Sequence, residues 1–110
     1  MLIQFFKRFF HRDNSELQKA VLSNPVLLDV RSSEEFASGS VKSAINIPVQ
    51  NLNSNISRIP KGRVIVAFCR SGSRSAMAVQ ILRKNGFQDV VNGGSWQNVQ
   101  AVITEMKKSI

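Results

Sequence analysis

The only cysteine of this 110-residue chain opens a short run of small and basic residues, Cys69-Arg70-Ser71-Gly72-Ser73-Arg74-Ser75. An apolar segment, residues 64–68, leads directly into it and is the clearest predicted strand; helical periodicity follows it. In a loop of small residues between a strand and a helix, backbone N–H groups can converge on an anion, and the helix dipole adds positive potential. The two arginines add full charges. We therefore predict that Cys69 is a thiolate nucleophile.

The chain offers no obvious base to activate that cysteine. Its one histidine, His11, lies in the N-terminal segment, so the loop itself must favour ionisation. A lone cysteine is often a buried apolar filler, but the six residues after Cys69 are polar or glycine, which disfavours that alternative. A single cysteine excludes an internal disulfide and a multi-cysteine metal site. We expect neither a metal nor a cofactor.

The charge balance favours an anionic partner. There are 15 Lys/Arg against 7 Asp/Glu, a formal net charge of +8. The cations form no continuous run, and one Trp with no Tyr is a poor stacking surface for nucleic acid. We therefore expect a small anionic ligand rather than nucleic acid. No apolar run is long enough to cross a membrane, so no transmembrane segment is expected.

Residues 1–12 differ in character from the single domain expected over residues 13–110. They hold four of the seven phenylalanines, three basic residues and no acid. Lys7 and Arg8 interrupt the apolar run and no small-residue cleavage site follows, so the segment does not read as a secretory signal. It either docks its phenylalanines on the domain or contacts a membrane surface or a second copy. The absence of a signal and of disulfides predicts a cytoplasmic location.

Strand and helix patterns alternate along the chain, which predicts an α/β fold with a mainly parallel sheet of four or five strands. The predicted strands are residues 26–30, 44–48, 64–68 and 89–91. The predicted helices are residues 14–23, 32–38, 49–59, 73–84 and a last one from residue 95. Residues 92–94, Asn-Gly-Gly, are predicted to form a tight turn.

Four motifs in this order resemble the rhodanese (thiosulfate sulfurtransferase) superfamily in its small single-domain form, over roughly residues 15–103. Residues 69–75 are similar to the family's active-site loop. The other matches are residues 28–36 with Gly39, residues 43–48, and Gly93-Gly94 with Trp96. The resemblance implies a three-layer rhodanese-like fold, with a central parallel sheet of four or five strands and helices on both faces.

The resemblance also implies a reaction without a cofactor. The Cys69 thiolate would take sulfane sulfur from thiosulfate or a persulfide donor, and the resulting persulfide would pass it to a thiol or to cyanide. The loop would bind the donor and the persulfide through backbone N–H groups and two arginines; its implied binding residues are Arg70, Ser71, Gly72, Ser73, Arg74 and Ser75.

Three charged residues outside the loop are candidate supports, Asp29, Arg31 and Glu35. A carboxylate inside a buried strand is costly unless it is paired. We expect Asp29 to pair with Arg74 and so brace the loop, and Arg31 to pair with Glu35.

Two other functions remain open at this point. Phosphatases and arsenate reductases of the same fold have a loop one residue longer, with the arginine six positions after the cysteine; here Arg74 comes five after Cys69. A sulfur carrier or binding module would keep the cysteine but turn over little thiosulfate. The chain also departs from the family pattern at residues 39–41, which read Gly-Ser-Val where the family usually has Gly-His-Ile.

Overall fold

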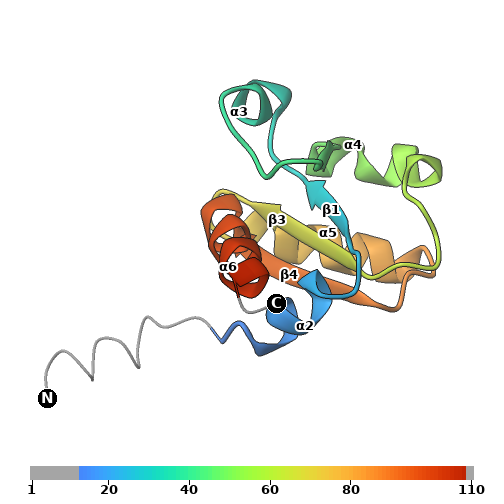
Figure 1. The fold of residues 1–110 in the computed structure, drawn as a ribbon. Helices are drawn as coiled ribbons and strands as arrows, with labels where there is room; N and C mark the ends of the chain where they lie inside the picture. The colour runs from blue at the N-terminus through green and yellow to red at the C-terminus, as the bar shows by residue number, and fades with distance from the viewer. Residues whose placement is uncertain (1–12, 109–110) are drawn as a thin grey trace, which may run out of the picture.

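The structure is a computed structural model that describes residues 13–108, so the expectations for residues 1–12 lie outside the described part. Strands and helices alternate along the chain (Figure 1). In order, the elements are α2 (Ser15–Val21), β1 (Val26–Asp29), α3 (Ser33–Ala37), β2 (Ile45–Asn46), α4 (Val49–Leu52), the 3-10 helix η1 (Asn53–Arg58), β3 (Ile65–Cys69), α5 (Ser73–Lys84), β4 (Val90–Ser95) and α6 (Trp96–Lys108).

The four strands between residues 13 and 108 form one sheet in the order β2-β1-β3-β4, and every pairing is parallel. Because parallel strands end at the same edge, the sheet gathers side chains with polar or sulfur atoms from all four of them there. Asp29 pairs with Asn46 on one side, and Cys69 pairs with Ser95 on the other. The predicted α/β class is confirmed, and this edge is where such sheets place their sites.

Helices cover both faces of the sheet, which confirms the three-layer prediction. All five residues of β3 are buried, as a central parallel strand requires. Ile65, Ala67 and Cys69 face the layer formed by α4, η1 and α5. Val66 and Phe68 face α2 and α6 (Figure 1). Full burial of a side chain such as Phe68 contributes about 1.5–3 kcal/mol to stability.

The prediction of a tight turn at residues 92–94 is wrong, because these residues belong to β4. The register runs from Ala67 opposite Asn92 to Phe68 opposite Gly94, so Gly93 is the extra residue of a β-bulge. A Cβ atom on Gly93 would lie 2.5 Å from Cγ2 of Val99 and 2.9 Å from Cγ1 of Val66. The glycine is therefore needed for α6 to pack closely on the sheet, not for a turn.

The other differences from the predicted elements are local. The expected strand over residues 44–48 is reduced to the two residues of β2. The helix expected over residues 49–59 is divided into α4 and η1, with a non-helical residue, Asn55, inside the second. Its Asn- and Ser-rich sequence competes for backbone hydrogen bonds, which weakens a continuous helix.

We predict that Gly93→Ala lowers the free energy of unfolding by about 1–3 kcal/mol, because the new methyl group overpacks the contact between α6 and β3. Urea denaturation measures the change. In a Val99→Ala background the nearest methyl group is gone, so the same substitution should cost less. An equal cost in both backgrounds would contradict this steric account.

Candidate active site

Cys69 lies at the carboxyl end of β3, beneath the turn that leads into α5. Its Sγ atom accepts a hydrogen bond from the backbone N–H of Gly72 at 3.0 Å and lies 3.4 Å from Oγ of Ser75. Gly72 has a φ of +105°, a left-handed conformation that lets the turn fold back so that its N–H faces the sulfur. Cys69 is completely buried, with 0% exposure. The sulfur therefore sits under its own loop.

The surroundings of the sulfur lower the pKa of the Cys69 thiol below its ordinary value. Burial is the largest single effect and acts in the opposite direction, because it disfavours the charged form. Hydrogen bonds to the sulfur outweigh it. They come from the side chain and backbone of Ser75 and from the backbone of Ser71 and Gly72. The loop thus acts on the sulfur through hydrogen bonds, and these favour the thiolate.

We predict that the pH dependence of Cys69 alkylation by iodoacetamide has a lower midpoint in the folded protein than in the same protein unfolded in urea. The reason is that unfolding removes the hydrogen bonds to sulfur and leaves an ordinary thiol. Alkylation rates measured across pH give both midpoints. A folded-state midpoint at or above that of the unfolded chain would contradict the prediction.

A buried ion pair joins Asp29 to Arg31, rather than to Arg74 as expected. Arg31 Nη2 lies 2.7 Å from Asp29 Oδ2, and both side chains are nearly inaccessible to solvent. Asp29 also accepts a hydrogen bond from Oγ of Ser40 at 2.7 Å. Arg31 also donates a hydrogen bond to the carbonyl of Gly39 at 2.6 Å. Its guanidinium lies 5.5 Å from the ring centre of Trp96. The carboxylate is thus fully satisfied within its own end of the sheet.

The second ion pair joins Arg74 to Glu35, rather than Arg31 to Glu35. Nη1 and Nη2 of Arg74 donate to the two carboxylate oxygens of Glu35 at 2.7 and 3.0 Å, which is a bidentate contact. Glu35 also forms a capping box at the start of α3 with Ser32. Hydrogen bonds from Arg74, and next from the Ser32 backbone, lower the pKa of Glu35 to about 2. The pair links α3 to the first turn of α5.

Both expected pairings were wrong for the same geometric reason. The side chain of Arg31 turns back onto Asp29, two residues earlier, and fills the place that Arg74 was expected to take. Arg74 then points from α5 toward α3 and meets Glu35. The four residues are the predicted ones, but their partners are exchanged.

We predict that the Arg74–Glu35 pair loses its contribution to stability in acid. The pKa of Glu35 is lowered on folding, so its contribution is complete above about pH 4.5 and is lost as pH falls toward 2. The stability advantage of the wild-type protein over Glu35→Gln should therefore shrink over this interval. Urea midpoints of both proteins measured from pH 7 to pH 2 test this. An advantage that stays constant to pH 2 would show that the charge of Glu35 is not involved.

The remaining loop residues differ in their exposure. Arg70, Ser71 and Ser73 are exposed, whereas Ser75 is fully buried beside the sulfur. The structure therefore brings the loop from Cys69 to Ser75 together as one site. Asp29 and Arg31 lie at the end of the neighbouring strand, and Glu35 reaches the loop through Arg74.

Two contributors were missed from the sequence. Ser40 stands where the family usually has histidine, and its hydroxyl donates to the buried carboxylate of Asp29. Asn92 contacts the loop from β4, with Oδ1 accepting from Oγ of Ser75 at 2.7 Å. The prediction of a turn at residues 92–94 concealed this contact of Asn92. A strand reading of residues 90–95 would have put Asn92 on the same face as Val90, toward α5.

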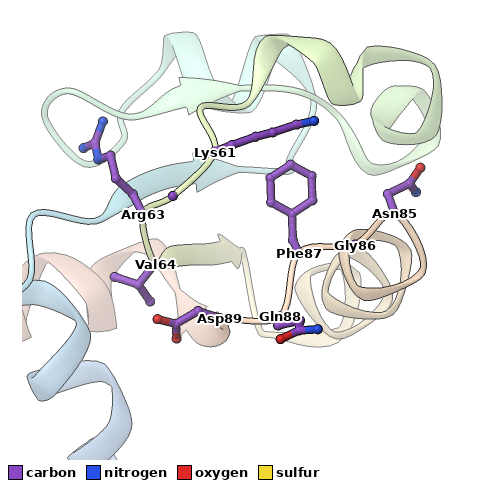
Figure 2. Close-up of a pocket in the computed structure, with 9 residues that line it drawn as sticks. Lys61, Arg63, Val64, Asn85, Gly86, Phe87, Gln88 and Asp89 are labelled. Carbon is purple, nitrogen blue, oxygen red and sulfur yellow. The ribbon is translucent and has the colours of Figure 1, made fainter.

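A separate hollow of about 500 Å³ lies at the other edge of the sheet. Its lining comes from residues 61–64 and 85–89, ahead of β3 and β4, with Phe87 and Lys61 close to each other (Figure 2). It is therefore at the amino ends of the strands, away from Cys69. Within residues 13–108 there is no group of three or more metal-ligating side chains, and no helix there is long and apolar enough to span a membrane.

The fold and the site define a parallel α/β domain with a hydrogen-bonded cysteine at the end of its central strand. The model of the rhodanese-like domain matches residues 13–101, and the chain belongs to that family. A sulfurtransferase of Allochromatium vinosum is 37% identical over 67 residues, which are 61% of this chain and 63% of the relative. The chain spans about a third to two thirds of the length of the first curated relatives it matches.

Solved structures agree with this assignment. The E. coli rhodanese with anions has a TM-score of 0.63 and 29% identity, over 67% of this chain and 89% of that one. A human single-domain sulfurtransferase has a TM-score of 0.62 and 31% identity, over 76% of this chain and 88% of that one. A rhodanese-like domain protein from Staphylococcus aureus has a TM-score of 0.64 and 34% identity, over 76% and 83%.

Proposed function

We propose that the protein is a sulfurtransferase that carries sulfane sulfur as a persulfide on Cys69. The observation that carries the proposal is the sulfur itself, held at the end of β3 with the N–H of Gly72 at 3.0 Å and with its pKa lowered by the loop. A thiolate in a cradle of N–H groups is both a nucleophile and a holder of negative charge. The names of the A. vinosum and human relatives support the same chemistry.

In the proposed reaction the Cys69 thiolate attacks the outer sulfur of thiosulfate. A lone pair on Sγ forms the new S–S bond, and the bond from the outer sulfur to the sulfonate group breaks. Sulfite leaves with that electron pair. The persulfide then holds one added sulfur, whose charge the N–H groups from Arg70 to Ser75 stabilise.

A second transfer returns the enzyme to its starting state. An acceptor thiolate, or cyanide, attacks the outer sulfur of the persulfide and forms a bond to it. The bond between that sulfur and Sγ breaks, and Cys69 leaves as the thiolate. The lowered pKa of Cys69 makes it a better leaving group, because a less basic thiolate leaves faster.

The two arginines of the loop have different proposed roles. Arg70 is exposed in the loop next to Cys69, where its charge attracts an anionic donor. Arg74 is held by Glu35, so much of its charge is already neutralised and it braces the loop. Asp29 and Arg31 support the neighbouring strand end as a buried pair. The hydrogen-bond partners of the sulfur are Gly72 and Ser75. We therefore assign positioning roles to Asp29, Arg31 and Glu35.

A sulfur carrier is the second candidate, and the burial of Cys69 favours it. With 0% exposure, the sulfur meets a donor only after the residues that cover it shift. A protein partner could drive that shift by docking, whereas free thiosulfate gains few contacts with which to do so. A carrier would form the persulfide and turn over little thiosulfate.

We propose that the protein acts in the cytoplasm, where thiol acceptors stay reduced.

We predict that the protein makes thiocyanate from thiosulfate and cyanide and that Cys69→Ser abolishes this activity, because serine cannot hold the transferred sulfur. Mass spectrometry after incubation with thiosulfate should show the wild-type chain heavier by one sulfur atom and the variant unchanged. Undiminished turnover by Cys69→Ser would overturn the proposal. A stable persulfide with negligible turnover would support the carrier instead.

A further inference from the structure

Asn92 lies behind the reactive cysteine, on the strand next to it. It is opposite Ala67 in the register of β3 and β4, and the bulge at Gly93 follows it directly. Strand alternation places it on the same face as Val90, which packs in the core layer of α5 together with Ala67 and Cys69. Its side chain therefore meets the first turn of α5.

Hydrogen bonds to the surrounding backbone and loop hold the amide of Asn92 in one orientation. Nδ2 donates to the carbonyl of Gly72 at 3.1 Å. Oδ1 accepts from the N–H of Gly94 at 3.0 Å and from Oγ of Ser75 at 2.7 Å. With donors satisfying the oxygen and an acceptor satisfying the nitrogen, a flipped amide would lose all three bonds.

The hydroxyl of Ser75 has one proton and three acceptors within reach. They are Oδ1 of Asn92 at 2.7 Å, the carbonyl of Gly72 at 3.1 Å and Sγ of Cys69 at 3.4 Å. The Gly72 carbonyl already accepts from the N–H of Ala76 at 3.0 Å and from Asn92, which uses both of its lone pairs. The competition for the proton is therefore between Asn92 and the sulfur.

We propose that Asn92 is a positioning residue that competes with the Cys69 sulfur for the single proton of the Ser75 hydroxyl. When Cys69 is a thiol, Ser75 donates to Asn92 and accepts the S–H. When the thiol proton leaves to a solvent base, the hydroxyl keeps its own proton and turns it toward the charged sulfur. No proton passes between Ser75 and Asn92; only the acceptor changes.

This competition sets how basic the thiolate remains. A sulfur with the full Ser75 hydrogen bond would ionise more readily but would be a weaker nucleophile, because nucleophilicity falls with pKa. The 2.7 Å contact to Asn92 means that turning the hydroxyl costs a good hydrogen bond. Asn92 therefore limits the stabilisation of the thiolate.

Charged groups near the site are not altered by changing Asn92 to an apolar residue. They are Arg70 in the loop, Arg74 on α5 with Glu35 on α3, and Asp29 with Arg31 at the end of β1. Arg74 interacts electrostatically with both Cys69 and Asp29. A change in the ionisation of Cys69 on replacing Asn92 by leucine is thus assigned to the hydrogen bonds.

The test compares Asn92→Leu with Asn92→Asp through the pH dependence of Cys69 alkylation by iodoacetamide. Both variants lose the bond from Nδ2 to Gly72, so the Gly72 carbonyl, 3.1 Å from Ser75, remains as the weaker competitor for the proton in both. Only aspartate also keeps the close acceptor for Ser75, and it adds a negative charge. We expect leucine to lower the midpoint by about 0.4–1 pH unit, the equivalent of one net hydrogen bond. We expect aspartate to raise it. If Asn92 only braces the loop, both variants raise the midpoint, and the proposal is overturned.

A Ser75→Ala background supplies the control. Without the hydroxyl there is no proton to compete for, so Asn92→Leu should no longer lower the midpoint. If it does so undiminished, the effect comes through the Gly94 contact or the bulge, and the proposal fails. Should Asn92→Leu not fold by circular dichroism, Asn92→Ala also lacks the acceptor and carries the same expectation.

The inference rests on the proposed function only in taking Cys69 as an ionising nucleophile. Alkylation involves no sulfur donor or acceptor, so its outcome is separate from the thiocyanate assay. A protein that makes no thiocyanate but shows the opposite shifts of leucine and aspartate would sustain the role of Asn92 alone.

Discussion

A negatively charged sulfur beneath a folded loop is stable only if hydrogen-bond donors replace the water that burial removes. Cys69 meets this constraint at the end of a fully buried strand. Its donors come from the backbone of the turn and from Ser75, so they are placed by the conformation of the loop rather than by a partner base. The left-handed conformation of Gly72, the start of α5 and the carboxyl end of β3 all serve to aim those donors.

Two acid–arginine pairs support this arrangement with very different energies. The Asp29–Arg31 pair is buried, and breaking it by removing one partner would cost about 3–5 kcal/mol because the other charge would be left uncompensated. The Arg74–Glu35 pair is about one-third exposed on each side, so solvent screens the attraction and the pair contributes far less to stability. The first pair therefore concerns the integrity of the sheet edge. The second concerns the position of α3 over the loop.

Local signals in the sequence were sufficient for the fold class, the central strand, the short helix α3 and the loop with its cysteine. Each depends on residues that are neighbours along the chain. The partner of Glu35 was not predictable in this way, because Arg74 is 39 positions away and meets it at distances of about 3 Å. The partner of Asp29 is only two residues away, but the sequence does not show that the Arg31 side chain turns back onto it. The bulge at Gly93 was also hidden, because two glycines signal a turn as readily as a close contact between a helix and a sheet.

The weak attachment of α3 makes this helix a place where the domain opens locally. This helix has five residues, none of them buried, and it projects from the sheet (Figure 1). Its capping box lies within the helix itself, and the ion pair with Arg74 is what ties it to α5. Its amide protons should therefore exchange with solvent through a local opening of low free energy, well before those of β3. Salt, which screens exposed charges, would widen that difference and leave the core unaffected.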